Sequence, residues 1–270
     1  MKRERLVVED LFVKYYKGEI LAVRDLSFRV WDKEIVAIVG PSGCGKSTLL
    51  NCITKMILPG IHAEVKGEIL IDGESVLEKT DTTCLKKLGY MFQRDTLLPW
   101  KSVKDNIMLP LILRGMSKED AETIAQEFLE MVGLKGFEDK YPHEISGGMR
   151  QRAQLARTLI YQPEIILMDE PFGALDAHTR LAMQNLVMQL WDRWRNTLVL
   201  VTHDLQEAIT IADRVVVLTA RPATVKSEYH VNIPRPRDAI RLRNDPLFHA
   251  IHDKIWGDLA DEVRKQLNMG

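Results

Sequence analysis

A glycine-rich stretch directly after a fully apolar run limits the folds open to this chain. Residues 35–39 read IVAIV, and residues 40–48 read GPSGCGKST. A short run that is apolar at every position predicts a strand buried on both faces, as in a parallel sheet covered by helices. The spacing G-x-x-x-x-G-K-[ST] is typical of a loop that wraps around phosphate before a helix begins. This strand–loop–helix unit therefore predicts an α/β domain.

The composition fits a globular domain and argues against other classes. The 270 residues are 46% hydrophobic and 28% charged, with a formal net charge of −1. Near-neutral charge argues against a protein that coats nucleic acid, and no run approaches the 18 apolar residues of a membrane span. The polar start of the chain does not resemble a signal peptide. We expect reduced thiols at Cys44, Cys52 and Cys84, because they form no C-x-x-C pair. We also expect any membrane role of the protein to come through a partner.

Further short runs rich in β-branched residues recur along the chain. They are Val7-Val8, 69–71, 165–168, 198–201 and 215–218. Helical patterns separate the later runs. Strands that alternate with helices favour an α/β domain with a covered, mainly parallel sheet.

The middle and the end of the chain predict helices. The sequence SKED at 117–120 is typical of a helix N-terminus, and a second helix is expected after Ser146. We therefore expect a helical insertion at about 95–163 within a main domain of residues 1–225. Residues 226–270 are expected to form a C-terminal extension with an amphipathic helix that begins at Asp245-Pro246. The apolar positions of that helix are Phe248, Ile251, Ile255, Leu259 and Val263.

The glycine-rich stretch has the chemistry to hold a polyphosphate. Its glycines let successive N–H groups point inward as an anion nest, and the helix that starts near Lys46 adds the positive end of its dipole. Lys46 places a charge on the terminal phosphates, and the Ser47 hydroxyl can bind Mg²⁺. We interpret Cys44 as a small residue that fills the tight loop. The expected nucleotide-binding residues here are Gly40, Pro41, Ser42, Gly43, Cys44, Gly45, Lys46, Ser47 and Thr48.

An acidic pair follows the apolar run at 165–168. Asp169 at the end of this run is placed to orient Mg²⁺, and Glu170 is placed to polarise an attacking water as general base. An acidic pair after a strand is more often a capping or solvated pair when it stands alone. Together with the phosphate loop, the catalytic interpretation is favoured.

Two more polar residues follow apolar runs. His203 follows the run at 198–201, and Gln93 follows an apolar run near 88–91. A lone histidine is more often structural, and a glutamine after a strand carries no signal by itself. The carboxyl ends of parallel strands share one sheet edge, where open α/β folds bind ligands, so we expect His203 to contact the γ-phosphate.

The order of motifs resembles that of the ATP-binding cassette (ABC) ATPases. The matching stretches are GPSGCGKST, MFQRDTLLPW, ISGGMRQR, IILMDEP, GALD and VTHD. They extend from the N-terminus to about residue 225. The stretches LLPWKSVKDNI and KYPHEISGGMRQR look most like the ATPase subunits of bacterial nitrate/sulfonate/taurine-type importers.

The resemblance implies a fold and an assembly of subunits. The fold is a P-loop α/β cassette with a mainly parallel sheet, an antiparallel β subdomain, an inserted helical subdomain and a C-terminal helical tail. Two cassettes would pair head to tail around ATP and Mg²⁺, attached to membrane permease subunits and indirectly to a substrate-binding protein. The expected place is the cytoplasmic side of the bacterial inner membrane, with no nucleic-acid partner.

The resemblance also implies site residues. Glu170, His203, Gln93 and Lys46 become the catalytic set, and Ser47, Gln93 and Asp169 become the Mg²⁺ ligands. Tyr16 looks like the residue that stacks on adenine, with Tyr15 as the competing candidate. In trans, the partner's nucleotide would meet Ser146, Gly147 and Gly148 of the signature motif and Asp176.

The segment after Gln93 is expected to contact the permease. Arg94, Leu97, Leu98, Pro99 and Trp100 form a candidate exposed apolar patch, with a local hydrophobic turn as the alternative. Two other functions compete with import: a cassette ATPase of DNA repair or the ribosome, and a regulatory module that only binds nucleotide. ATPases of DNA repair or the ribosome usually carry a long coiled coil or two cassettes, and this sequence predicts neither. Intact Glu170 and His203 argue against a module that only binds nucleotide.

Overall fold

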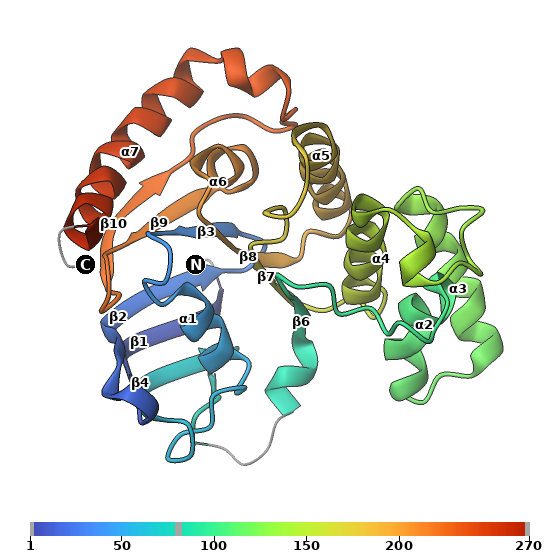
Figure 1. Cartoon of the computed structure of the whole chain (residues 1–270), viewed down its shortest axis with the longest axis horizontal. Helices are drawn as coiled ribbons and strands as arrows, with labels where there is room; N and C mark the ends of the chain where they lie inside the picture. The colour runs from blue at the N-terminus through green and yellow to red at the C-terminus, as the bar shows by residue number, and fades with distance from the viewer. Residues whose placement is uncertain (1–2, 79–82, 268–270) are drawn as a thin grey trace.

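The computed structural model describes residues 3–78 and 83–267 and contains two sheets (Figure 1). The antiparallel sheet has the strand order β2-β1-β4-β5. Its strands are β1 (Glu4–Tyr15), β2 (Leu21–Trp31), β4 (Ala63–Ile71) and β5 (Glu74–Ser75). It corresponds to the antiparallel β subdomain that the resemblance implied.

The central sheet has the order β10-β9-β3-β8-β7-β6 and is parallel except at β10, which runs antiparallel to β9. Its strands are β3 (Ile35–Val39), β6 (Leu88–Met91), β7 (Ile165–Asp169), β8 (Thr197–Thr202), β9 (Arg214–Leu218) and β10 (Val225–His230). β3, β7, β8 and β9 are buried along their whole length, which confirms the strands expected from apolar runs.

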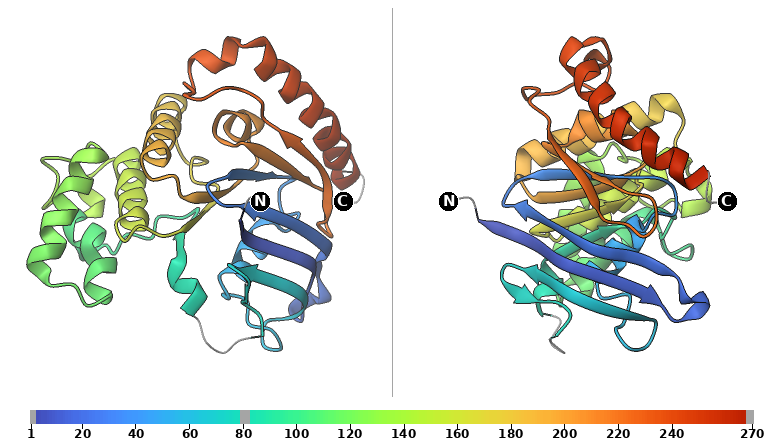
Figure 2. Two further views of the ribbon diagram at one scale, coloured as in Figure 1. Left: turned by 180° about the vertical axis from the view of Figure 1, so that it is seen from behind. Right: turned by 90° about the vertical axis from the view of Figure 1, so that its left-hand side faces the viewer.

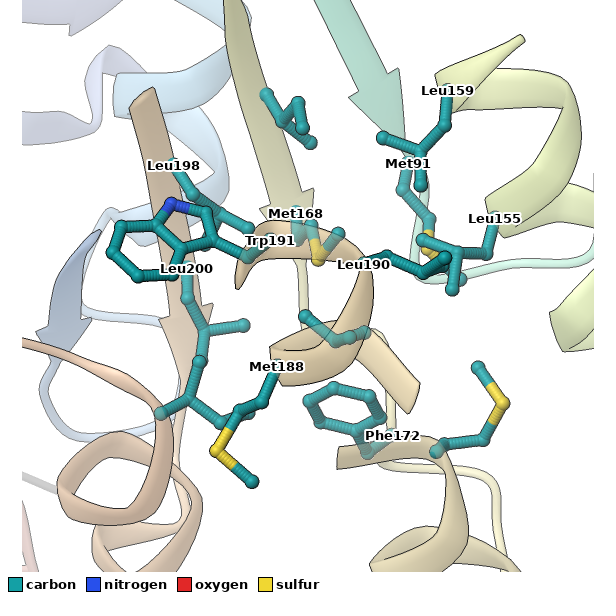
Figure 3. Close-up of a cluster of buried hydrophobic side chains, with 14 of the residues drawn as sticks. Met91, Leu155, Leu159, Met168, Phe172, Met188, Leu190, Trp191, Leu198 and Leu200 are labelled. Carbon is teal, nitrogen blue, oxygen red and sulfur yellow. The ribbon is translucent and has the colours of Figure 1, made fainter. Parts of the chain in front are cut away.

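The two faces of the central sheet pack into different cores. In β7, Ile165 and Leu167 face the core shared with α1 (Lys46–Ile53) and the antiparallel sheet, whereas Ile166 and Met168 face the other core. This alternation is the two-residue period of a strand. The second core is covered by α4 (Gly147–Leu159), α5 (Ala177–Trp194), α6 (Leu205–Ile211) and α7 (Pro246–Leu267), and Figure 3 shows Met168, Leu155 and Trp191 in it. Figure 2 shows the antiparallel sheet and α7 on opposite sides of the central sheet.

The helical lobe projects to one side of the central sheet (Figure 1). It contains α2 (Val103–Leu113), α3 (Lys118–Met131) and α4 (Gly147–Leu159). Serines at 102, 117 and 146 precede these helices, and each hydroxyl accepts a hydrogen bond from the N–H three residues later. The helix starts expected near residues 117 and 146 are confirmed.

The chain then returns to the central sheet. α5 (Ala177–Trp194) and α6 (Leu205–Ile211) connect the later strands, and α7 (Pro246–Leu267) follows β10. The amphipathic helix expected after Asp245-Pro246 is therefore present. Within the described residues, none of the helices has both the length and the apolar character needed to cross a bilayer.

Candidate active site

The loop between β3 and α1 requires glycine at particular points. Gly43 has φ +70° and Gly45 has φ +135°, which L side chains rarely adopt. A Cβ on Gly45 would also lie 2.9 Å from the backbone oxygen of Ala22, and a Cβ on Gly40 would lie 3.1 Å from Leu218 Cβ. The loop is therefore built from bare backbone because neighbouring segments leave no room for side chains at two of its glycines.

Lys46 is the first residue of α1, and its side chain reaches back into this loop. Its side chain is buried, and Nζ donates to the carbonyl oxygens of Gly40 (2.9 Å) and Pro41 (3.0 Å). Cys44 is also buried, and burial raises the pKa of its thiol. A protonated, enclosed thiol fits the filling role expected for Cys44, and Cys52 and Cys84 are likewise buried free thiols.

Asp169 ends β7 beside the loop and has an unused oxygen. Oδ1 is buried without a hydrogen-bond partner, while Oδ2 accepts from the Tyr90 hydroxyl at 3.4 Å. Burial raises the pKa of Asp169, and a hydrogen bond from the Ser47 hydroxyl opposes that rise. A buried carboxylate oxygen that lacks a protein donor, next to a serine hydroxyl, fits the oxygen ligands that Mg²⁺ prefers.

Three of the expected catalytic side chains meet at one oxygen atom. Glu170 Oε2 accepts a hydrogen bond from Gln93 Nε2 at 3.1 Å and lies 3.0 Å from His203 Nδ1. The three residues follow β6, β7 and β8, which are neighbours in the central sheet. The shared edge expected from the sequence is thus present, and it brings these side chains together from positions up to 110 residues apart along the chain.

The backbone at Glu170 is held in a rare conformation. Its φ is +45°, although it is not a glycine, and its N–H donates to the Val201 oxygen of β8 at 2.8 Å. Such conformations cost about 1–3 kcal/mol and cluster at functional sites. The same backbone position carries the side chain whose Oε2 lies 3.0 Å from His203 Nδ1.

The two tyrosines near residue 15 have different surroundings. The Tyr15 hydroxyl lies 3.0 Å from Thr48 Oγ1, and its ring packs against the core shared with α1. The Tyr16 side chain is 52% exposed. Only Tyr16 therefore offers an open aromatic face.

The signature motif starts α4. Ser146 and Gly147 are exposed, and the Ser146 hydroxyl caps the helix through Met149 N–H. A Cβ on Gly148 would lie 2.6 Å from Thr179 Cγ2 of α5, so a side chain there would require Thr179 to shift. Asp176 is the exposed N-cap of α5 and accepts from the Thr179 hydroxyl at 2.6 Å, which lowers the pKa of Asp176.

The signature motif and the phosphate loop belong to opposite faces of the central sheet. α1 packs in the core on one face, and α4 packs in the core on the other. Figure 1 shows α1 beside the antiparallel sheet and α4 at the helical lobe. Within one chain, α4 therefore does not lie against α1, and we infer that its N-terminus meets the phosphates of another chain.

The segment after Gln93 is only partly the exposed patch that we expected. Pro99 and Trp100 are exposed, and Trp100 has 71% of its surface accessible. Leu97, however, is buried, and Leu98 is half-buried. The expectation of an exposed Leu97 is wrong because that side chain packs into the core with α4.

Sequence reasoning missed several residues that support the site. Tyr90 contacts Asp169 from the neighbouring strand. Glu207 accepts from the Thr202 hydroxyl at 2.6 Å directly before His203, and Arg180 of α5 pairs with Asp204 at 3.3 Å. Glu207 could have been noticed in the sequence because it stands three residues after Asp204, the N-cap of α6, which is the spacing of a capping box.

Comparison with known proteins identifies the family. Residues 23–173 match the ABC transporter family. The chain belongs to that family. This cassette is 41% identical to the uncharacterized ABC transporter ATP-binding protein MJ0412 of Methanocaldococcus jannaschii, over 98% of this chain and 97% of the relative. It is 40% identical to the aliphatic sulfonates import ATP-binding protein SsuB of Bacillus cereus, over 90% of this chain and 91% of that protein.

A solved structure agrees with the sequence comparison. The ATP-binding cassette MJ0796, in a dimeric post-hydrolysis state bound to ADP and Pi, matches with a TM-score of 0.73 and 32% identity. The match covers 85% of this chain and 100% of that one. The ABC ATPase fold expected from the resemblance is confirmed, and the chain is an ATP-binding ATPase of this family.

Proposed function

We propose that this cassette hydrolyses ATP to drive a bacterial importer of the nitrate/sulfonate/taurine type. The observation that carries the hydrolytic role is the meeting of Gln93 and His203 at a single oxygen of Glu170. The importer role is supported by the likeness to SsuB, a sulfonate import protein, along nearly the whole chain.

The phosphate loop would bind the triphosphate. Its backbone N–H groups and the start of α1 attract the anionic phosphates, and Lys46 exchanges its carbonyl partners for phosphate oxygens. Ser47, Gln93 and Asp169 would hold Mg²⁺, with the unpaired Asp169 Oδ1 as the best-placed ligand. Bound Mg²⁺ neutralises charge on the β- and γ-phosphates.

Glu170 would act as the general base on water. Its carboxylate takes a proton from the attacking water, whose oxygen bonds to the γ-phosphorus as the bond from that phosphorus to the β–γ bridging oxygen breaks, releasing ADP and phosphate. Gln93 and His203 hold the carboxylate through the same oxygen, and His203 is half exposed, so its ring can turn toward a γ-phosphate. Tyr16, whose aromatic face is open, is the proposed adenine platform.

A second copy would complete the site. Ser146, Gly147 and Gly148 expose N–H groups at the positive end of α4, yet their own phosphate loop lies across the sheet. We therefore assign them, with Asp176, to the nucleotide of a head-to-tail partner. The dimeric state of the related MJ0796 cassette supports this pairing.

The membrane partners follow from the same relatives. Permease subunits would contact the side of the helical lobe near the exposed Pro99 and Trp100. A substrate-binding protein would act through the permease. The cassette would then lie peripherally on the cytoplasmic side of the inner membrane, as expected of an import ATP-binding protein. We also propose that the ATPase domain spans residues 1–225, with a helical lobe inserted at about 95–163, and that residues 226–270 form a C-terminal extension.

One pair of variants tests the hydrolytic mechanism. Glu170→Gln preserves an oxygen for Gln93 and His203 but removes the base, so ATP binding should persist while turnover falls by about 10²–10⁴-fold. Glu68→Gln, on the exposed face of β4, is the matched control. Wild-type turnover by Glu170→Gln would remove Glu170 from the base role.

A second pair tests the shared site. Ser146→Arg should leave ATP binding by the monomer nearly unchanged and abolish hydrolysis by the pair. Ser117→Arg removes an equivalent exposed helix cap on α3 and should hydrolyse ATP normally. Normal hydrolysis by Ser146→Arg would contradict the shared site.

A further inference from the structure

The last turns of α7 carry a polar stripe that contacts β10 and the segments after β9 and β3, with Glu262 buried and Gln266 exposed. Asp258, Glu262 and Gln266 are four residues apart, so they share one face of the helix. Asp258 accepts from the Tyr229 hydroxyl of β10 at 2.7 Å. Figure 1 shows α7 lying along the β9–β10 side of the central sheet. The stripe therefore starts at β10 and continues toward the carboxyl ends of the strands.

Glu262 fastens α7 to the segment after β9. Its side chain is 2% exposed, and Oε2 accepts from the backbone N–H of Ala220 at 3.0 Å. Oε1 lies 3.2 Å from Lys226 Nζ and 2.6 Å from Lys265 Nζ. Burial alone raises the pKa of Glu262, but the hydrogen bonds from Lys265, Ala220 and Lys226 bring it below its ordinary value. Because Glu262 accepts from several donors, it holds the last turns of α7 against the segment after β9.

The anchored segment also forms one wall of the phosphate loop. A Cβ on Gly45 would lie 3.2 Å from Ala223 Cβ, three residues beyond the N–H that Glu262 holds. On the next turn of α7, Gln266 Nε2 donates to the backbone oxygen of Ser42 at 2.8 Å. The C-terminal helix thus reaches the loop twice, through the 220–223 segment and directly.

We propose that Gln266 is a positioning residue for the nucleotide site, with α7 serving as a brace that orients the Ser42–Gly43 peptide for phosphate binding. The carbonyl and the N–H of a trans peptide point in opposite directions. A hydrogen bond that turns the Ser42 oxygen toward α7 therefore turns the Gly43 N–H away from α7. In this proposal, that N–H is one of the donors that the loop presents to phosphate.

The loop needs such a brace because the surroundings of Gly43 restrain the orientation of its peptide only weakly. It has φ +70°, and an added Cβ there would meet no atom within 4 Å. A glycine in open space can rotate its peptide at little steric cost. The Gln266 hydrogen bond selects one orientation before the nucleotide arrives, which lowers the ordering cost of binding. This inference rests on the proposed binding of ATP at the loop.

Gln266→Met tests the brace directly. Methionine keeps the length of the side chain and removes the donor. We expect the Kd for MgATP to rise about two- to twelve-fold, the range for losing one hydrogen bond. Gln266→Glu, which also cannot donate and adds a negative charge near the phosphates, should weaken binding more. Titration calorimetry in the Glu170→Gln background measures Kd without ATP consumption.

Controls separate positioning from stability. Arg264→Met alters the exposed side of the same turn, where Arg264 pairs only at 3.5 Å with Asp261, and should leave the Kd unchanged. The thermal unfolding midpoint of Gln266→Met should stay at the control value, and in active protein the KM should rise while kcat holds. An unchanged Kd for both Gln266 variants overturns the inference, as does an equal weakening by Arg264→Met. Failure of the Glu170→Gln parent to bind ATP would instead contradict the proposed function.

Discussion

Asn106 of α2 should be one of the most costly polar residues to remove. It is fully buried and holds the segment that leads from Gln93 into the helical lobe. The two hydrogens of Nδ2 are shared among the backbone oxygens of Leu98 (3.1 Å), Lys101 (3.1 Å) and Ser102 (3.0 Å), and Oδ1 accepts from Leu98 N–H at 2.7 Å. Asn106→Ala removes all of these bonds in one step.

The cost follows from which backbone groups lose their last partner. The Leu98 oxygen still accepts from Lys101 N–H at 3.1 Å, and the Ser102 oxygen still accepts from Asn106 N–H at 2.9 Å. Leu98 N–H and the Lys101 oxygen have no such second partner among the described contacts. An unsatisfied buried group costs about 1–3 kcal/mol and two are left, so Asn106→Ala should lower the free energy of unfolding by about 2–6 kcal/mol.

Two measurements check this value. Urea unfolding gives the change in free energy, and hydrogen exchange should show that the Leu98 amide loses protection. Asn185→Ala is the matched control, because Asn185 Oδ1 makes one bond, to Ala239 N–H at 3.0 Å, and its loss should cost about 1 kcal/mol. Equal costs for the two variants, or a Leu98 amide that stays protected, would refute the reasoning.

Two further variants probe buried charge. Glu207 is 3% exposed, and burial raises its pKa from 4.5 to about 7, so the stability it contributes is complete below pH 4.5 and lost as pH rises through 7. Glu207→Gln should remove that loss and gain at most about 3 kcal/mol over wild type at pH 8, measured by urea unfolding across pH; identical pH profiles would contradict it. Arg214→Met should cost about 3–5 kcal/mol, because it leaves Glu34, now 2.9 Å from Arg214, buried without its partner. Adding Glu34→Gln should recover part of that cost, and no recovery would argue against an unpaired charge as the cause.

Local features of this cassette were predictable because neighbouring residues decide them. The strand at 35–39 and the helix starts after Ser117 and Ser146 depend on apolar runs, caps and glycines within a few residues. The order of motifs was sufficient to identify the family. The exposure of Leu97 was predicted wrongly, because a short apolar run does not specify which of its side chains another helix will cover.

The sequence by itself determined the chemistry: a phosphate loop, an acidic pair, a histidine and a second glycine-rich helix start. Tertiary structure alone decided which of these meet. The order of strands brings Gln93 and His203 to Glu170, while α4 lies at the helical lobe, apart from α1. The contact from Gln266 to Ser42 spans 224 residues and has no motif. Such contacts depend on how whole elements pack, and the local sequence carries no signal for them.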